Sequence, residues 1–551
     1  MVSVDKGLEK LILQFALANA LQYGGKANAG AVIGKIIAAK PELKENMAGI
    51  GKLVSDIVKD VNEWGLEKQG KELKKIGEPA AVEKKERKGL PELEGAKMGK
   101  VVTRIPPEPS KYTHIGHAIS FLINYLYAKK YKGKCILRFE DTNPEKSNQE
   151  YVDAFKEDIL GFLEIKPDKI VFSSNDLEKM YSFAEKLIEN ENAYVCTCAR
   201  EKIKDMRHKG EECECRVRTY SMELWKKMLK GGFGEEGAVL RLKLDMKADN
   251  QTLRDPVIFR VCLTPHFKLG KKFKVWPLYD FQNVVEDELC GITHILRSAE
   301  FGEMRIELQN KLKELLGFNK QFVMQYGRFG VEGAITQGRE IRKLIEEGKV
   351  SGWDDPRLVT IKALKKRGYV KETFFYLAQR VGLRPGSATF DWNIINSENR
   401  KHIDKNSNRY FFVAEPIQIT LSKIPTRTVS APLYPGKRKM RKIPVSKKVF
   451  VDKIDFIANR GKEVRLMHFA NFVLDKEAKY TGKPVKDIPK IHWVPEKAVK
   501  AKLVMDTGAV LNGLAEPAVG KIKAGETLQF ERIGFCRVDS TKPLVFYFAH
   551  K

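Results

Sequence analysis

The chain of 551 residues lacks several features that would place it in a membrane or outside the cell. It has no long uninterrupted apolar run, and we therefore expect no membrane-spanning segment and no membrane partner. Its first ten residues, M-V-S-V-D-K-G-L-E-K, carry charge and lack the apolar core of a secretory signal, so we expect none. Cysteine is scarce, at eight residues, and four of these cluster, which favours metal binding in a reducing compartment over a disulfide framework. We expect a cytoplasmic protein.

Acidic residues are too few to balance the basic ones, at 71 against 99, and the formal net charge is +28. Such an excess indicates a polyanionic partner, nucleic acid before an anionic membrane, with general solubility as the plain alternative. Charge alone does not separate RNA from DNA, but an excess over the whole chain favours a large RNA. Hydrophobic residues make up 43%, which is enough for real cores in several domains.

Residues 101–128 predict a strand, a rigid loop and a helix. Three prolines, at positions 106, 107 and 109, exclude a helix before Ser110, and helical spacing of apolar residues begins after His117. The segment His114-Ile115-Gly116-His117 therefore lies at a helix start, where unpaired N–H groups and the helix dipole favour a phosphate. Gly116 would let a ligand approach the backbone, and the two imidazoles could stabilise charge on phosphate oxygens. Two ordinary surface histidines are the alternative.

The string R-I-P-P-E-P-S-K-Y-T-H-I-G-H-A, residues 104–118, resembles the ATP-binding "HIGH" region of class I aminoacyl-tRNA synthetases. The similarity is to the glutamyl/glutaminyl branch in its archaeal and eukaryotic form, and it runs from about residue 8 to the C-terminus. It implies a multidomain protein with an α/β Rossmann-like catalytic domain. It also implies an ATP site formed by the following residues of this motif: Pro107, Ser110, His114, Ile115, Gly116 and His117.

The same resemblance implies four amino-acid ligands: Arg104, Glu140, Tyr279 and Arg297. Glu140 follows a predicted strand at 135–139, and ligands of open α/β sheets bind outside the carboxyl ends of strands. In the family it would contact the α-amino group. Arg297 follows a second strand-like run, where the glutaminyl enzymes carry an uncharged residue. A guanidinium pairs bidentately with a carboxylate and matches an amide poorly, so Arg297 favours glutamate over glutamine. A solvated strand end is the alternative for Arg297.

Cysteines form the pattern C-x-C-x14-C-x-C, from residues Cys196, Cys198, Cys213 and Cys215. Zinc prefers four soft ligands in a tetrahedron, and two thiolate pairs supply them. Four thiolates leave no open position for a substrate, so we expect one structural Zn²⁺; two unrelated thiol pairs are the alternative. Some members of the resembled family carry zinc in this inserted subdomain.

The second signature of the family is altered in this chain. Where the family has a mobile loop ending L-S-K-x-K-I, the chain reads Thr336-Gln337-Gly338-Arg339-Glu340-Ile341. Gly338 stands in place of the lysine that stabilises pyrophosphate, and Lys111 and Thr113 replace the usual glycine and leucine of the first motif. Removing one such electrostatic interaction costs ~10²–10³ in rate. Arg339, beside a flexible glycine, is the nearest substitute, which leaves open a slow enzyme, a rescued enzyme or a binding protein.

We expect the chain to divide into consecutive domains. They are an N-terminal helical domain at 1–65, a charged linker at 66–99 with the run E-K-K-E-R-K at 83–88, a catalytic domain at 100–340 containing the acceptor-end-binding zinc insertion at about 195–270, a helical stem-contact region at 341–405 and an anticodon-binding region of β-barrels at 406–551. The basic run K-R-K-M-R-K at 437–442 could grip phosphate, with a solvated hairpin tip as the alternative.

The resemblance as a whole implies a glutamate–tRNA ligase. Such an enzyme uses ATP and Mg²⁺ to convert L-glutamate to glutamyl-AMP, and then transfers glutamate to the 3′-terminal ribose of tRNA(Glu). Whether tRNA(Gln) is also charged stays open, and we expect a monomer. The alternative is a tRNA-binding paralogue with weak or no activity, because of the altered loop; a glutamine ligase and a small-molecule nucleotidyltransferase have less support.

Overall fold

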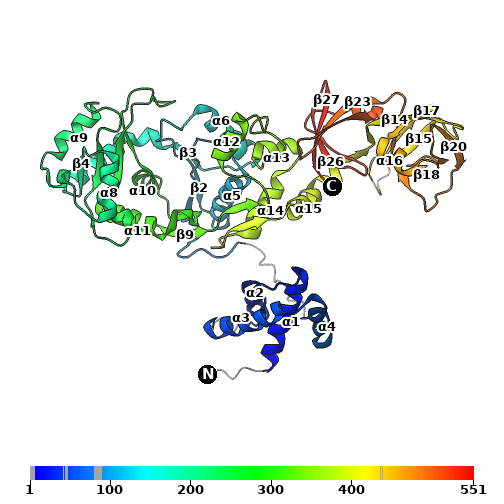
Figure 1. Ribbon diagram of the computed structural model, residues 1–551. Helices are drawn as coiled ribbons and strands as arrows, with labels where there is room; N and C mark the ends of the chain where they lie inside the picture. The colour runs from blue at the N-terminus through cyan, green and yellow to red at the C-terminus, as the bar shows by residue number, and fades with distance from the viewer. Residues whose placement is uncertain (1–5, 41–42, 44–46, 80–89, 435, 437–438) are drawn as a thin grey trace. The chain divides into compact units, whose positions relative to one another are not determined.

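The computed structural model describes residues 6–40, 43, 47–79, 90–434, 436 and 439–551 and is drawn in Figure 1. It divides into two compact units, residues 1–88 and 89–551. Within the described residues, no helix combines the length and the apolar character needed to cross a membrane. The charged run at 83–88 and the first two residues of the basic run at 437–442 lie outside the described residues.

The N-terminal unit is built from helices that bury an aliphatic core. Its helices are α1 Lys6–Gln22, α2 Ala29–Ala39, α3 Met47–Glu63 and α4 Leu66–Ile76. The expectation that the segment of α4 is linker is wrong, because Leu73 packs into the core of the unit. The buried Gln69 amide donates to the carbonyls of Gly25, Val61 and Trp64 at 2.9, 2.9 and 3.0 Å. The charges of α4 lie on its outer face, and they give the segment the composition of a solvated linker.

Parallel strands form the centre of the second unit. Strands β1 Val102–Ile105, β2 Lys134–Phe139 and β3 Lys169–Phe172 pair in parallel, and so do β8 His294–Ser298 and β9 Phe322–Tyr326. The N–H of Thr293 donates to the carbonyl of Val102 at 3.0 Å, which brings β8 beside β1. The three-stranded sheet β3-β2-β1 and the separate β8-β9 pair beside β1 thus follow the strand order of a Rossmann-like sheet.

Helices connect and cover these strands. Helix α5 links β1 to β2 in a βαβ unit, and β10 pairs in parallel with β11. The elements of this part are α5 Ile115–Lys130, α6 Gln149–Lys156 continuing as the π-helical turn Glu157–Phe162, α7 Leu177–Glu189, α10 Tyr279–Leu289, α11 Gly302–Leu316, β10 Phe329–Val331 and β11 Ala388–Phe390.

A separate antiparallel sheet interrupts the parallel one. It runs β4-β5-β6-β7, with strands β4 Ala193–Cys196, β5 Val239–Leu242, β6 Val257–Val261 and β7 Val275–Pro277, and it is accompanied by α8 Arg200–Lys209 and α9 Ser221–Leu229. Trp225, Phe259 and Trp276 fill its core. A single residue separates β7 from α10, so the chain re-enters the catalytic region directly at Tyr279.

Helices also precede the C-terminal sheets. They are α12 Gly338–Glu346, α13 Ile361–Arg367, α14 Lys371–Val381 and α15 Trp392–Ile403. The buried guanidinium of Arg367 donates to the carbonyls of Phe548 and Ala549 at 3.2 and 2.7 Å, and to that of Pro356 at 3.3 Å. This side chain ties α13 to the last strand of the chain.

Two curved sheets follow, and each returns to its own start. In one, the edge strands are β12 Asn408–Tyr410 and β13 Phe412–Ala414, and in the other they are β21 Lys490–Ile491 and β22 Trp493–Pro495. Because each edge pair is separated by a single residue, the two edges of each sheet meet, as in a β-barrel. The first sheet also holds β23 Val499–Val504, β24 Val510–Ala515, β25 Thr527–Phe530, β26 Gly534–Thr541 and β27 Leu544–His550; the second holds β14 Pro416–Leu421, β17 Lys448–Asp452, β18 Glu463–Leu466, β19 Asn471–Val473 and β20 Glu477–Gly482.

A hairpin of β15 Thr428–Pro432 and β16 Met440–Pro444 carries the end of the basic run. Side chains alternate along β16, so Lys442 is exposed whereas Arg441 is buried. Arg441 forms ion pairs with Glu516 at 2.9 Å and Glu531 at 2.7 Å. The expectation that this run grips phosphate is therefore wrong for Arg441, which holds the hairpin on the first sheet instead.

Candidate nucleotide and amino-acid site

A large pocket, of about 1370 Å³, gathers most of the residues singled out from the sequence. Its walls include Arg104, Pro107, His114, Gly116, His117, Glu140, Tyr279, Arg297, Gly338 and Arg339. Two expected ligands do not line it. Ile115 is fully buried in the hydrophobic core, and the carbonyl of Ser110 instead accepts a hydrogen bond from Arg342 at 2.8 Å.

His114 caps helix α5, and this changes the role expected for the helix start. Its Nδ1 accepts from the N–H groups of Gly116 and His117 at 3.1 and 3.4 Å, and the N–H of Ile115 donates to the carbonyl of Val359 at 3.0 Å. These amides are therefore paired within the protein. The expectation that they are unpaired and open to a phosphate is wrong, because the His114 cap and the carbonyl of Val359 satisfy them.

The two imidazoles stack, with ring centroids 3.6 Å apart and planes inclined by 25°. Burial lowers the pKa of His114 to about 3, helped by the charge of Lys111, and burial holds the pKa of His117 well below its usual range. Both rings are neutral at physiological pH. Since each accepts at Nδ1, each can present an Nε2–H to a phosphate oxygen as a hydrogen-bond donor rather than as a cation.

Gly116 is required by a contact within the protein. A Cβ at this position would lie 2.7 Å from the carbonyl oxygen of Phe329 on β10. A backbone atom cannot retreat as a flexible side chain can, so any larger residue would push β10 from the start of α5. The expected reason for this glycine, close approach of a ligand, is not needed to explain it.

At the other end of the pocket, two carboxylates and two guanidiniums form a buried network. Arg138 donates to Asp287 at 2.7 Å and to Glu140 at 2.9 Å, while Arg104 lies 3.3 Å from Asp287. The amide of Asn283 also donates to Glu140, at 2.7 Å. Burial raises the pKa of Glu140 against the pull of Arg138 and Arg104, whereas the same two arginines overcome burial and hold the pKa of Asp287 below its usual range.

Arg297 enters the same end of the pocket from β8. Its Nη1 donates to the side-chain carbonyl of Gln309 at 2.8 Å, and the Gln309 amide donates to Asp280 at 3.1 Å. Asp280 also accepts from Arg305 at 2.7 Å. Tyr279, on the first turn of α10, lies beside Arg297 and has its pKa raised by burial. The chain of hydrogen bonds from Arg297 through Gln309 to Asp280 fixes the direction of the Arg297 guanidinium.

The sequence predictions missed the residues that hold these ligands: Arg138, Asn283, Asp287 and Gln309. One signal was available for two of them. Asn283 and Asp287 are polar residues four apart on one face of helix α10, and both are buried. Polar residues on one buried face of a helix indicate a hydrogen-bonded or ligand-binding face.

The altered second signature is not a loop from residue 336 to 341. Helix α12 begins at Gly338, so Arg339 and Glu340 belong to its first turn and are exposed. The expected flexibility at Gly338 therefore gives way to regular helix. A Cβ at Gly338 would lie 3.0 Å from Cδ and 3.3 Å from Cβ of Lys111, so the Lys111 side chain covers this glycine.

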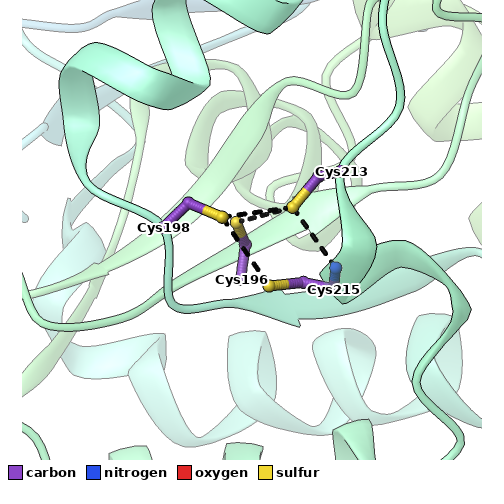
Figure 2. Close-up of side chains that lie close together, drawn as sticks. All are labelled: Cys196, Cys198, Cys213 and Cys215. Atoms are coloured by element: carbon purple, nitrogen blue, oxygen red, sulfur yellow. Dashed lines mark hydrogen bonds between the residues drawn. The ribbon is translucent and has the colours of Figure 1, made fainter.

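The two cysteine pairs come together in one cluster, as Figure 2 shows. The Sγ atoms of Cys198 and Cys213 are 3.3 Å apart, those of Cys196 and Cys213 3.6 Å, and those of Cys198 and Cys215 3.8 Å. Zn–S bonds of about 2.3 Å in a tetrahedron put sulfur atoms about 3.8 Å apart, so the four thiols fit a zinc ion. Cys198 also lines the pocket, which puts the cluster next to the site.

Comparison with known proteins agrees with this geometry over nearly the whole chain. The family described as "tRNA synthetases class I (E and Q), catalytic domain" matches residues 100–405, and two anticodon-binding domains of the same family match 407–491 and 490–539. The chain is 39% identical to the glutamate–tRNA ligase of Pyrococcus abyssi, over 99% of this chain and all of that one. It is 38% identical to that of Korarchaeum cryptofilum (98% and 99% covered) and 36% identical to that of Methanocaldococcus jannaschii (97% and 98%). The likeness to a solved glutamate tRNA ligase from Elizabethkingia meningosepticum, with a TM-score of 0.42 and 19% identity over 55% of this chain and 70% of that one, is too weak to add weight. The chain belongs to the class I tRNA synthetases of the E and Q family.

Proposed function

We propose that this protein is a glutamate–tRNA ligase, which activates L-glutamate with ATP and transfers it to the 3′-terminal ribose of tRNA. One observation carries the proposal. The neutral pair of histidines, His114 and His117, lines the same pocket as its arginine-rich end, where Arg104 and Arg297 lie. A nucleotide and an anionic amino acid can therefore be held side by side. Relatives that span the full chain bear the same activity in their names.

The pocket promotes the activation of glutamate by positioning the two substrates. A carboxylate oxygen of glutamate attacks the α-phosphorus of ATP, the bond from that phosphorus to the bridging oxygen breaks, and pyrophosphate leaves with the electron pair. His114 and His117 donate hydrogen bonds to phosphate oxygens, whose charge rises in the transition state. Mg²⁺ bound together with the nucleotide would neutralise part of the phosphate charge. In the second step, a ribose hydroxyl of tRNA attacks the activated carbonyl and AMP leaves.

Selection of glutamate rests on excess positive charge at the arginine-rich end. The guanidiniums of Arg104, Arg138 and Arg297 outnumber the carboxylates of Glu140 and Asp287. A buried excess of positive charge favours a ligand with two carboxylates and one ammonium over its uncharged-side-chain amide. In this scheme Glu140 receives the α-amino group, Arg297 and Arg104 receive carboxylates, and Tyr279 closes the wall.

The remaining parts of the chain are assigned to tRNA and to structure. Cys196, Cys198, Cys213 and Cys215 hold one structural Zn²⁺ in the inserted antiparallel sheet, which receives the acceptor end. The helices between 341 and 405 contact the tRNA stem, and the barrels beyond them receive the anticodon. The short distances among the four Sγ atoms support the zinc, and the basic net charge supports the RNA contacts.

An aminoacylation assay tests the proposal. Purified protein is incubated with ATP, Mg²⁺, total archaeal tRNA and labelled glutamate or, in parallel, labelled glutamine. We expect glutamate to enter the tRNA fraction and glutamine to enter at less than about a hundredth of that rate. Tight tRNA binding without incorporation of either amino acid would instead identify a tRNA-binding protein.

A further inference from the structure

Lys111 occupies an unusual place in the pocket. It lies in the loop between β1 and α5, it lines the pocket together with His114 and His117, and its side chain covers Gly338 at the start of α12. The neighbouring carbonyl of Ser110 is bound by Arg342, so the loop and α12 are joined at this point. The half-buried lysine side chain is therefore part of the pocket wall.

No residue in the described part of the chain holds the charge of Lys111 as a counter-ion. Its ammonium has no hydrogen-bond or ion-pair partner among those residues, although the side chain is partly buried. Arg342 and Lys146 add positive charge around it, and only Glu108 opposes them. Burial lowers the pKa of Lys111, which means that the free protein bears a cost for this charge. A multiply charged anion bound there would offset that cost.

The charge of Lys111 acts on the two histidines of the pocket. The positive charge of Lys111 contributes to the lowered pKa of both His114 and His117. All three residues line the same pocket, so the charge of Lys111 and the two rings face one space. An anion that accepts hydrogen bonds from the histidines would therefore meet Lys111 on its next oxygens.

We propose that Lys111 is the cation that binds the β- and γ-phosphates of ATP and stabilises the departing pyrophosphate. This inference rests on the ligase function proposed above. As the bond to the bridging oxygen breaks, charge accumulates on the pyrophosphate, and the ammonium of Lys111 donates hydrogen bonds to its oxygens. No proton is transferred, so the lysine serves as a fixed charge.

Side chains at positions 111 and 338 compete for the same space in the pocket wall. A Cβ at residue 338 would lie 3.0 Å from Cδ and 3.3 Å from Cβ of Lys111, so a long side chain at 338 would displace the side chain of Lys111. The chain carries lysine at 111 and glycine at 338, the reverse of the pattern of the resembled family. The positive charge that α12 lacks at Gly338 is thus supplied by Lys111, whose side chain covers this glycine. Arg339, the substitute expected from the sequence, is exposed on the first turn of α12.

The test combines removal of the charge with an exchange of the two residues. Lys111→Met should lower the kcat of glutamate-dependent ATP–pyrophosphate exchange, measured with tRNA present, by about 10²–10³-fold. Its KM for glutamate should change less than about threefold, because the charge acts on the phosphates. Lys111→Gly should be equally slow, and the double variant Lys111→Gly/Gly338→Lys should recover at least tenfold over it. Gly338→Lys alone should not exceed the unmodified protein, because the new side chain would displace Lys111 from its place.

Matched controls separate this role from stability and from general charge. Lys179→Met removes a charge from helix α7 of the same unit, where the lysine side chain is 62% exposed, and it should leave exchange unchanged. Melting temperatures of all variants should agree within a few degrees; if Lys111→Met fails this, Lys111→Arg, which keeps the charge, should retain more activity than Lys111→Gly. Exchange by Lys111→Met within threefold of the unmodified protein, or a double variant no faster than Lys111→Gly, would overturn the inference.

A binding measurement keeps the inference apart from the ligase proposal. Inorganic pyrophosphate titrated into the unmodified protein should bind at least tenfold more tightly than into Lys111→Met. If the protein charges tRNA but pyrophosphate binds both equally, the role of Lys111 is wrong and the ligase stands. If the protein charges no tRNA but pyrophosphate binding depends on Lys111, the phosphate site is right and the ligase proposal falls.

Discussion

At the scale of single residues, the charges of the pocket are oriented before any ligand arrives. Arg138 bridges Asp287 and Glu140, and Arg297 is held by Gln309. A guanidinium whose direction is already fixed loses little conformational entropy when it binds a carboxylate. The arginine-rich end should therefore discriminate by charge as well as by shape.

Replacement of Arg297 tests that discrimination. Arg297→Ala should lower kcat/KM for glutamate by about two orders of magnitude, equivalent to ~3 kcal/mol, because a carboxylate would be buried without its partner. Steady-state aminoacylation with varied glutamate measures the change. Arg305→Ala removes the outer end of the hydrogen-bond chain that holds Arg297, where the Arg305 side chain is 40% exposed. It should lower kcat/KM for glutamate by less than about tenfold. Glutamine competing on equal terms in the unmodified protein would contradict the assignment.

Single-residue predictions succeed where the residue type alone decides the chemistry and fail where distant neighbours decide it. The pocket does bring His114, His117, Glu140 and Arg297 together. The reason for Gly116, in contrast, is the carbonyl of Phe329, more than 200 residues away in the chain. No local pattern contains such a contact, so sequence alone could only supply a ligand as the explanation.

At the scale of elements, periodicity predicts most helices and strands of the catalytic region, and it fails at their junctions. The strand, the prolines and the helix around residues 101–130 follow directly from the spacing of apolar residues. The start of helix α12 escapes prediction because Thr336-Gln337-Gly338 has the composition of a loop and helix propensity at a glycine is low. Helix α4 escapes it because its many charges hide the two residues, Gln69 and Leu73, that it buries.

Helix α10 carries a buried acid whose ionisation should be visible as pH-dependent stability. Burial raises the pKa of Glu286 to about 7, and the nearby acids Asp176, Glu140 and Asp287 oppose the lowering effect of Arg138. Folding therefore takes up a proton between the ordinary pKa of 4.5 and about 7. The stabilising contribution is complete below pH 4.5 and is lost as the pH rises through 7.

Glu286→Gln removes this titration while keeping the shape of the side chain. The variant should melt at nearly the same temperature as the unmodified protein at pH 5 and at a higher temperature at pH 8.5, as measured by differential scanning fluorimetry. The difference between the two proteins should open between pH 5 and 8. A difference that stays constant over this range would show that Glu286 keeps its ordinary ionisation in the folded protein.

The inserted sheet should depend on zinc. Its four cysteines are free thiols with Sγ atoms close enough for one tetrahedral ion, and they join the end of β4 to the segment after α8. Metal analysis of protein purified without chelator should give about one equivalent of zinc, and Cys213→Ala/Cys215→Ala should give less than half. Cys290→Ser, a thiol outside the cluster, should keep the metal. Zinc retained by the double variant would rule out this ligand set.

At the scale of the whole molecule, the net charge and the connections between domains both favour the binding of one large anionic ligand. The chain carries a net charge of +28, and Arg367 ties the helices next to the catalytic region to the barrel that ends the chain. A connection of this kind favours the binding of one large ligand by surfaces on both parts. Not every basic residue serves that purpose, because Arg441 is used within the fold, whereas Lys439 and Lys442 beside it are exposed.

The salt dependence of tRNA binding measures how much of that charge meets phosphate. Each basic side chain that binds a phosphate releases counter-ions, and six to ten such interactions would lower the affinity by roughly 10³–10⁵ between 50 and 200 mM salt. We expect a fall in this range by filter binding, and a flat affinity would contradict an RNA role for the basic surface. Lys439→Ala/Lys442→Ala should reduce the slope of log affinity against log salt by about one unit for each phosphate that is no longer bound. Lys71→Ala/Lys75→Ala removes the same charge from α4, where both lysines are 75% exposed and lie near glutamates. An equal reduction in both variants would mean that total charge, and not the β15–β16 hairpin, attracts the tRNA, because only binding at a defined place distinguishes two variants of identical net charge.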